Sequence, residues 1–255
     1  MGIIAANAAW LLAAAFVAVA SLAGCRDGAR REEPPARPAA NEAAPATPGD
    51  PRPVVLIVGT SLTAGLGVDP SEAYPAILQK KIDAAGLGCR VVNAGVSGET
   101  SAGARRRMDW LMRQKVAVLV VETGANDGLR GQDPEATRAN IEAIFDRALK
   151  QQPSPRLVLL AMEALPNYGE DYRRRFREIY SAVAEKTGAI PVPFFLEGVA
   201  GEVALNQADG IHPTAEGHKR GAENVWSVLG PALVGESGGR SVCDGALDAP
   251  RSVRP

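Results

Sequence analysis

The run VVLIVGTS at residues 54–61 decides the fold class of this chain. Its first five residues are apolar and mostly β-branched, and Pro53 and Gly59 bound them on either side. An unbroken apolar run of this length indicates a strand that is covered on both faces, as in a parallel sheet. Comparable runs occur at residues 89–93, 116–122, 157–162 and 189–194. We therefore predict a parallel sheet with one strand for each of these five runs.

Amphipathic stretches separate the predicted strands. Apolar residues recur at helical spacing, Pro134 stands in the first turn of one stretch, and Gly188 follows the end of another. The predicted helices cover residues 74–85, 100–113, 134–150, 172–186 and 214–229. Repeated β-α units with helices on both faces form a doubly wound, three-layer α/β/α sandwich.

The two ends of the chain differ in composition from this domain. Residues 1–24 form an apolar segment, and its ending Leu22-Ala23-Gly24-Cys25 resembles a bacterial lipobox with Cys25 as the lipidated residue. An ordinary signal peptide or a retained anchor helix are the alternatives. Residues 25–52 are rich in Pro and Ala and read as a disordered tether. We expect the domain at residues 53–235 and a disordered tail at residues 236–255.

The charge of the chain argues against a nucleic-acid partner. The formal net charge is −1 at pH 7, and the basic runs at residues 105–107 and 173–175 are short. We read both runs as solvated helix faces, with weak attraction to anionic lipid head groups as the alternative. The sequence has no Cys/His spacing typical of a metal site. We expect no metal, no cofactor and a monomeric protein.

Two cysteines remain once Cys25 is assigned to lipidation, namely Cys89 and Cys243. An exported protein can form a disulfide between them. Because Cys89 begins a predicted strand and Cys243 falls in the predicted tail, we favour two unpaired thiols. A disulfide between Cys89 and Cys243 is the less favoured alternative.

Four short motifs follow predicted strands or precede a predicted helix. In open parallel sheets, ligands bind outside the carboxyl ends of the strands, and all four motifs fall on that edge. Each motif alone also fits an ordinary turn, and only their occurrence together points to a functional site. They are Gly59-Thr60-Ser61-Leu62, Asn93-Ala94-Gly95, Gly124-Ala125-Asn126-Asp127 and Asp209-Gly210-Ile211-His212-Pro213.

A serine, a histidine and an aspartate among these motifs suit nucleophilic catalysis. The hydroxyl of Ser61 needs a base, because a free hydroxyl is a poor nucleophile near neutral pH. The chain contains two histidines, and we expect His218 on the surface of the last helix, which leaves His212 as the base. Asp209 stands three residues before His212, from where a carboxylate can orient the imidazole.

The same motifs offer donors for an oxyanion. Negative charge on the former carbonyl oxygen would be stabilised by the backbone N–H groups of Ser61 and Gly95 and by the side-chain amide of Asn126. Tyr168, in the loop after the fourth predicted strand, is a candidate for lining an acyl pocket or for simple loop packing.

The four motifs resemble the sequence blocks of the SGNH-hydrolase superfamily, which includes the GDSL-type lipases and esterases. The runs GANDGLRG (124–131), MEALPNYG (162–169) and LNQADGIHP (205–213) are similar to its arylesterase/thioesterase I/lysophospholipase branch. The resemblance covers about residues 53–233. It implies a flavodoxin-like sheet ordered 2-1-3-4-5, no metal, and ester or thioester hydrolysis through a seryl acyl-enzyme. The signature maps onto Ser61, Gly95, Asn126 and His212, with Asp209 completing the triad.

The chain departs from the family motif Gly-Asp-Ser-Leu at one position, where Thr60 replaces the Asp. A threonine hydroxyl retains hydrogen bonding but lacks the negative charge, so we expect a slower enzyme with its activity preserved. The motif also differs from the Gly-x-Ser-x-Gly elbow of α/β-hydrolases, because Thr63 stands where that pattern has Gly.

These observations predict a serine esterase that acts on short-to-medium acyl esters, with thioesters and lysophospholipids as further substrates. The N-terminal segment places it at the periplasmic face of a bacterial membrane, anchored through Cys25. Two alternatives remain open: an O-deacetylase of envelope polysaccharide, and a weakly active surface lipoprotein that binds acyl chains.

Overall fold

The computed structural model describes residues 50–152, 155–234 and 241–244 of the chain. Its five described strands form one parallel sheet in the order β2-β1-β3-β4-β5, which confirms the predicted fold and strand order. The strands are β1 (Val54–Gly59), β2 (Arg90–Gly95), β3 (Val116–Glu122), β4 (Arg156–Leu160) and β5 (Ile190–Val192).

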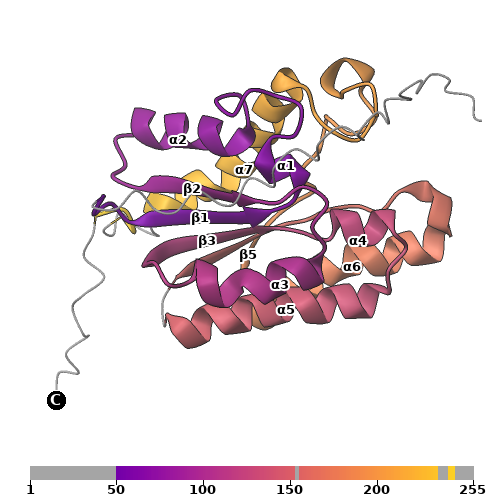
Figure 1. Ribbon diagram of the computed structural model, residues 1–255, viewed down its shortest axis with the longest axis horizontal. Helices are drawn as coiled ribbons and strands as arrows, with labels where there is room; N and C mark the ends of the chain where they lie inside the picture. Colours follow the sequence, from indigo (N-terminus) through magenta and orange to yellow (C-terminus); the bar gives the residue numbers. More distant parts are fainter. Residues whose placement is uncertain (1–49, 153–154, 235–240, 245–255) are drawn as a thin grey trace, which may run out of the picture. The chain divides into compact units, whose positions relative to one another are not determined.

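Helices cover both faces of this sheet (Figure 1). Helices α2 (Tyr74–Ala84) and α7 (Ala215–Val234) pack together on one face. On the other face lie α3 (Ser101–Leu111), α5 (Pro134–Gln151) and α6 (Gly169–Thr187). Two short helices, α1 (Ser61–Ala64) and α4 (Ala125–Leu129), begin directly after β1 and β3, at the carboxyl edge of the sheet. Short 3-10 turns occur at Pro166–Tyr168 and Val203–Leu205.

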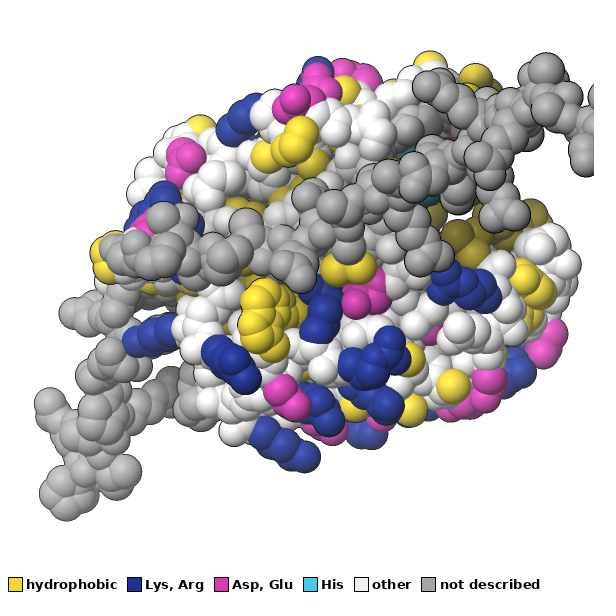
Figure 2. Space-filling view, viewed as in Figure 1, with side chains coloured by type: hydrophobic (Ala, Val, Ile, Leu, Met, Phe, Trp, Pro, Cys, Tyr) yellow, Lys and Arg dark blue, Asp and Glu magenta, His cyan; other side chains and the backbone are white. Residues whose placement is uncertain are grey.

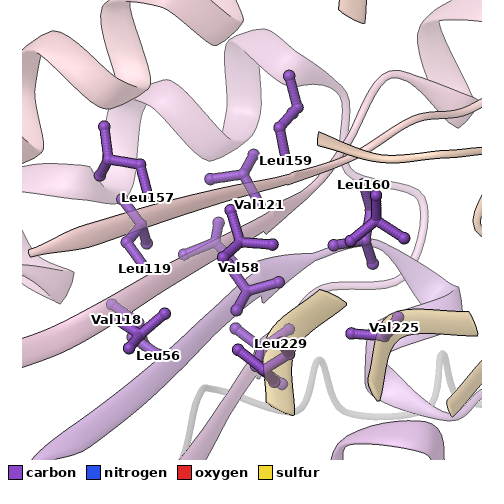
Figure 3. Packing of buried hydrophobic residues seen from close by; sticks show 14 of the residues in the cluster. Leu56, Val58, Val118, Leu119, Val121, Leu157, Leu159, Leu160, Val225 and Leu229 are labelled. Atoms are coloured by element: carbon purple, nitrogen blue, oxygen red, sulfur yellow. The ribbon is translucent and has the colours of Figure 1, made fainter. Parts of the chain in front are cut away.

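The core consists of aligned rows of aliphatic side chains on the central strands. The parallel register places Leu56, Leu119 and Leu157 in one row, and Val58, Val121 and Leu159 in the next row on the same face. The side chain of Leu160 points to the opposite face, where Val225 and Leu229 of α7 lie (Figure 3). All of these residues are buried, so the carboxyl edge of the sheet stands on a well-packed base.

The last two long helices extend beyond their predicted ends. Helix α6 begins at Gly169, and helix α7 continues through Pro231 to Val234. Buried Ala232 and Leu233 explain the extra turn of α7, because tertiary packing outweighs the low helix propensity of proline. No helix within the described ranges is long and apolar enough to cross a bilayer.

A disulfide joins Cys89, just before β2, to Cys243, so our preference for two unpaired thiols was wrong. The segment 241–244 folds back against the end of α7, where Ser241 and Val242 both donate hydrogen bonds to the carbonyl of Leu233. Cys243 is buried, and this part of the predicted tail therefore belongs to the domain. Composition alone could not reveal this contact, because it joins residues 154 positions apart. The signal segment, the lipidation site Cys25 and the rest of the tail lie outside the described residues.

The two basic runs contribute less free positive charge than the sequence suggests. Arg107 is mostly buried and pairs with Glu99, so our reading of residues 105–107 as a fully solvated face was wrong for this residue. The arginines at 173, 174 and 175 form ion pairs with nearby carboxylates. In the view of Figure 2, acidic side chains likewise lie between the basic ones over the layer of α3 and α5.

Candidate active site

The junction of β1 and α1 places Ser61 at the carboxyl edge of the sheet. Thr60 is the N-cap of α1, and its side chain accepts a hydrogen bond from the backbone N–H of Leu62. Ser61 is the first residue of α1, so its own N–H has no partner within the helix. A side chain on Gly59 would overlap Thr63 and Glu122, which explains why glycine precedes the turn.

Three side chains form a continuous hydrogen-bonded line in this region. The Oγ atom of Ser61 lies 2.9 Å from Nε2 of His212, and Nδ1 of His212 lies 2.6 Å from Oδ2 of Asp209. The structure therefore brings together the three residues that the sequence pointed to. Because the carboxylate accepts from Nδ1–H, the Nε2 atom is left as the acceptor for the Ser61 hydroxyl proton.

The loop between Asp209 and His212 keeps the carboxylate ionised. The hydrogen bond from His212 and, to a smaller extent, those from the backbone N–H groups of Ile211 and His212 together lower the pKa of Asp209 to about 2. Both N–H groups donate to Oδ1 over 3.0 Å. Gly210 adopts a φ of +74°, a conformation that suits glycine, and this closes the tight turn.

Gln207 ties the His212 loop to the segment that follows α1. Its side-chain amide donates to the carbonyls of Leu66 and Pro213, over 2.7 and 2.9 Å. Its backbone N–H donates to the carbonyl of His212 over 2.7 Å. This residue therefore fixes the distance between the loop that carries the histidine and the loop that carries the serine.

The predicted donor Gly95 does not face the site, which corrects the sequence assignment. Strand β2 continues through Gly95, and its N–H donates to Oδ1 of Asn93 over 2.9 Å. A side chain at Gly95 would overlap the backbone of α1, so this glycine is needed for close packing. Gly98 lines the cleft instead, and its N–H has no partner within the described part of the chain.

Asn126, the first asparagine after β3, lines the cleft together with Ser61 and Gly98. Its side-chain Nδ2 donates one hydrogen bond, to the carbonyl of Glu99 over 3.0 Å, and an amide group has a second hydrogen to offer. The carboxylate of Glu99 in turn pairs with Arg107, which also donates to the carbonyl of Ala94. Burial raises the pKa of Glu99, and the adjacent Arg107 opposes this effect.

The cleft beside Ser61 has a volume of about 620 Å³ and a mainly apolar lining. Two charged side chains, Glu163 and Arg173, also border it. Tyr168 does not line the cleft: its hydroxyl donates to the carbonyl of Leu129, and its ring packs against Tyr172. The large apolar side chains in the lining are those of Leu62, Leu66, Leu129, Met162, Leu165, Phe194, Leu196 and Ile211.

His218 is buried, which contradicts the expected surface position. Its Nδ1 accepts a hydrogen bond from the backbone N–H of Tyr74 over 3.3 Å, and its ring stacks against the Tyr74 ring. Burial lowers the pKa of His218 to about 4, so the imidazole is neutral near pH 7. No hydrogen bond joins it to Ser61 within the described residues, which leaves His212 as the histidine at the serine.

Sequence reasoning missed Gly98, Gln207 and Glu122. The glycine is part of a turn after β2, and only the backbone path shows that it reaches the cleft. The glutamine falls within the run around His212, but nothing in its spacing indicates its two carbonyl partners. Glu122 gave the clearest signal, since it is the single charged residue in the buried strand Val116–Glu122.

The fold and the site together define a class of protein. A doubly wound parallel sheet that carries a serine, an asparagine and an aspartate–histidine pair at its carboxyl edge is the arrangement of the SGNH hydrolases. The sequence profile of the GDSL-like Lipase/Acylhydrolase family matches residues 57–220. The chain belongs to this family.

Individual relatives agree with this assignment and with the expected branch. The chain is 43% identical to Esterase TesA of Pseudomonas aeruginosa over 180 residues, which cover 70% of this chain and 89% of the relative. It is 36% identical to Thioesterase 1/protease 1/lysophospholipase L1 of Escherichia coli K12 over 180 residues, covering 70% and 84%. A crystal structure of TesA matches with a TM-score of 0.68 at 42% identity, over 71% of this chain and 99% of that chain. The protein is therefore an enzyme of the carboxylic ester hydrolase class.

Proposed function

We propose that this enzyme hydrolyses carboxylic esters and thioesters with short-to-medium acyl chains, through an acyl-enzyme on Ser61. The observation that carries the proposal is the line from Ser61 Oγ through both ring nitrogens of His212 to Asp209, with contacts of 2.9 and 2.6 Å. A nucleophile within hydrogen-bond reach of a base that a third group orients is the arrangement that activates a serine.

In the first half of the reaction, Ser61 Oγ attacks the carbonyl carbon of the ester. Its proton passes to Nε2 of His212, and ionised Asp209 stabilises the resulting imidazolium. When the tetrahedral intermediate collapses, the bond to the leaving group breaks. The alcohol or thiol takes the proton from Nε2 and departs, which leaves the acyl group on Ser61.

The oxyanion of the intermediate needs donors beside Ser61. We assign this role to the backbone N–H groups of Ser61 and Gly98 and to the side-chain amide of Asn126. These three residues border the same cleft, and neither N–H group has a partner within the described residues. Loss of one such donor typically raises the barrier by about 3 kcal/mol.

The second half of the reaction returns the enzyme to its starting state. A water molecule gives a proton to Nε2 of His212 and attacks the acyl carbon. Collapse of the second tetrahedral intermediate breaks the bond to Ser61 Oγ, which takes the proton back from His212. The carboxylic acid is then released, and no cofactor enters either half.

The mainly apolar cleft supports acyl chains as substrates. A volume of about 620 Å³ lies within the range of ordinary small-molecule sites, and aliphatic side chains border most of it. The names of the curated relatives, an esterase and a thioesterase/lysophospholipase, support the inclusion of thioesters and lysophospholipids.

The export and lipid anchoring of the protein are part of the proposal. The apolar segment 1–24, the lipobox-like residues ending at Cys25 and the tether at 25–52 favour a membrane-anchored protein, whose domain begins at residue 53 and includes the segment 241–244. The Cys89–Cys243 disulfide supports an oxidising compartment. Metabolic labelling with a radioactive fatty acid tests this: Cys25→Ser should abolish the label, and a labelled variant would rule the anchor out.

The proposed activity is tested with p-nitrophenyl esters from acetyl to palmitoyl, using the full chain and its Ser61→Ala variant. We expect turnover that peaks at one acyl length and disappears in the variant, while both proteins unfold at a similar temperature. Equal background rates for both proteins across the series would reject the esterase. Acetylated glycans would then be the next substrates to test.

A further inference from the structure

A buried carboxylate lies against the turn that carries Ser61. Glu122 ends strand β3, is fully buried, and is in direct contact with residues on either side of the serine. Its Oε2 accepts from the backbone N–H of Thr60 over 2.9 Å and from the hydroxyl of Thr63 over 2.8 Å. The Thr60 hydroxyl lies 3.0 Å from each carboxylate oxygen.

Every group around Glu122 is arranged to donate to it. Thr63 can donate to the carboxylate while accepting from the hydroxyl of Tyr74, which lies 2.8 Å from Thr63 Oγ1. Within the described residues, no Lys, Arg or His forms an ion pair with Glu122. Among the described residues, the titratable groups that Glu122 affects are two buried tyrosines, Tyr74 of α2 and Tyr180 of α6. Burial raises the pKa values of both tyrosines well above 10.

Burial and hydrogen bonding act on the pKa of Glu122 in opposite directions. Burial raises the pKa of Glu122 to about 7, while the hydrogen bonds from Thr60 and Thr63 lower it. If Glu122 is protonated, the hydroxyl of Thr60 or Thr63 must rotate so that it accepts a hydrogen bond from the carboxyl O–H. The N–H of Thr60 has no such freedom, so the ionised carboxylate is the form that satisfies all three donors.

We propose that Glu122 is a positioning residue, which holds the nucleophile turn through Thr60 and Thr63 and supplies from β3 the carboxylate that the motif lacks at position 60. Thr60 and Thr63 stand on either side of Ser61 and Leu62, so their contacts with one carboxylate fix both ends of the turn. The inference rests on the proposed role of Ser61 as the nucleophile.

The positioning role predicts an effect on turnover more than on binding. Small displacements of a nucleophile or of an oxyanion donor reduce the rate strongly, by about 100-fold for 1 Å. Glu122 does not border the cleft, so substrate affinity should change little. Protonation of Glu122 should likewise slow turnover, because it disturbs the same contacts.

The test compares the full chain with Glu122→Gln, using kcat and KM for a p-nitrophenyl ester between about pH 5.5 and 9. A glutamine keeps the volume but turns an NH₂ group toward one of the donors. We expect kcat to fall by about 10- to 100-fold with KM changed by less than about threefold. The pH profile of kcat for the variant should also lack the ionisation of Glu122, whose pKa burial raises to about 7.

Three further variants separate positioning from general destabilisation. Thr63→Val removes one donor and should lower kcat, whereas Thr63→Ser keeps the hydroxyl and should restore most of it. Thr123→Val removes a buried hydroxyl that has no hydrogen-bond partner within the described residues and does not border the cleft, so it should leave kcat unchanged. If Glu122→Gln fails to fold, the Thr63 pair decides the matter.

The proposal is overturned if Glu122→Gln keeps the original kcat and pH profile, or if Thr63→Val and Thr63→Ser behave alike. It is also overturned if Thr123→Val loses as much kcat as Glu122→Gln. Activity that Ser61→Ala abolishes and Glu122→Gln leaves intact would reject this inference alone. Absence of activity in the unaltered enzyme would reject the proposed function itself.

Discussion

Thr60, which stands where the family motif has an aspartate, contacts a carboxylate on the neighbouring strand β3. Thr60 lacks the carboxylate of the family motif, and from the sequence we expected the local charge to be lost. The structure instead places the carboxylate of Glu122 against the hydroxyl and the N–H of Thr60. This contact argues against the slower enzyme that we expected from the loss of the aspartate at position 60.

Asp209 offers the clearest test at the scale of a single residue. Asp209→Asn replaces the acceptor at His212 Nδ1 by a group that can favour the wrong tautomer, so we expect kcat to fall by about 1,000- to 10,000-fold with KM little changed. Because the pKa of Asp209 is about 2, its protonation should not contribute to any loss of activity above about pH 4. Steady-state kinetics of both proteins check this.

Glu216→Gln is the matched control for that substitution. Glu216 is an exposed carboxylate at the start of α7 that pairs only with Lys219 among the described residues. An equal loss of kcat in the control, or a loss below about tenfold in Asp209→Asn, would contradict the assigned role.

At the scale of elements, the strands were predictable and the loops were not. Continuous apolar runs such as Val116–Glu122 identified each strand, and the carboxyl edge followed from parallel topology. The loop after β2 escaped prediction, because the N–H of Gly95 is taken by Asn93 and the following turn carries Gly98 to the cleft. The course of this loop depends on side-chain contacts with α1 and α3, which a local sequence pattern cannot predict.

Helix α3 supports this loop through Arg107. Arg107→Gln leaves the mostly buried Glu99 without its cation and removes the donor to the Ala94 carbonyl. Breaking such a pair should lower the free energy of unfolding by about 2–4 kcal/mol. Since the Glu99 carbonyl holds Asn126, we also expect kcat to fall by about tenfold.

Chemical denaturation and kinetics of Arg107→Gln measure both effects. Arg105→Gln, an exposed change on the same helix, is the control and should leave stability and kcat close to those of the unaltered protein. If the two variants lose stability equally, the ion pair with Glu99 does not have the supporting role described.

At the scale of the whole molecule, the Cys89–Cys243 disulfide joins the segment 241–244 to the amino end of β2. Cys243→Ser should lower the free energy of unfolding by about 2–4 kcal/mol and the unfolding temperature by about 5–15 °C. The bridge lies at the edge of the sheet opposite Ser61, so kcat at 25 °C should stay unchanged. Thermal unfolding with and without reductant checks this, and an unchanged temperature would contradict it.

Glu122 also makes the stability of the whole domain depend on pH. Because burial raises its pKa from the ordinary value of 4.5 to about 7 in the folded protein, the native state retains a proton that the unfolded chain loses. Stability should therefore fall as pH rises from about 4.5 to 7, by about 3 kcal/mol from this group. Urea denaturation should show that this slope is absent in Glu122→Gln, and parallel curves for both proteins would contradict it.

The most direct test of the acyl-enzyme mechanism is covalent labelling of the full chain by a fluorophosphonate, which traps an activated serine. Intact mass and peptide mapping should show one adduct, on Ser61. Ser61→Ala should remain unlabelled, and His212→Ala should react far more slowly because its serine has no base. Labelling at another residue, or ester hydrolysis that continues without an adduct on Ser61, would contradict the proposed acyl-enzyme mechanism.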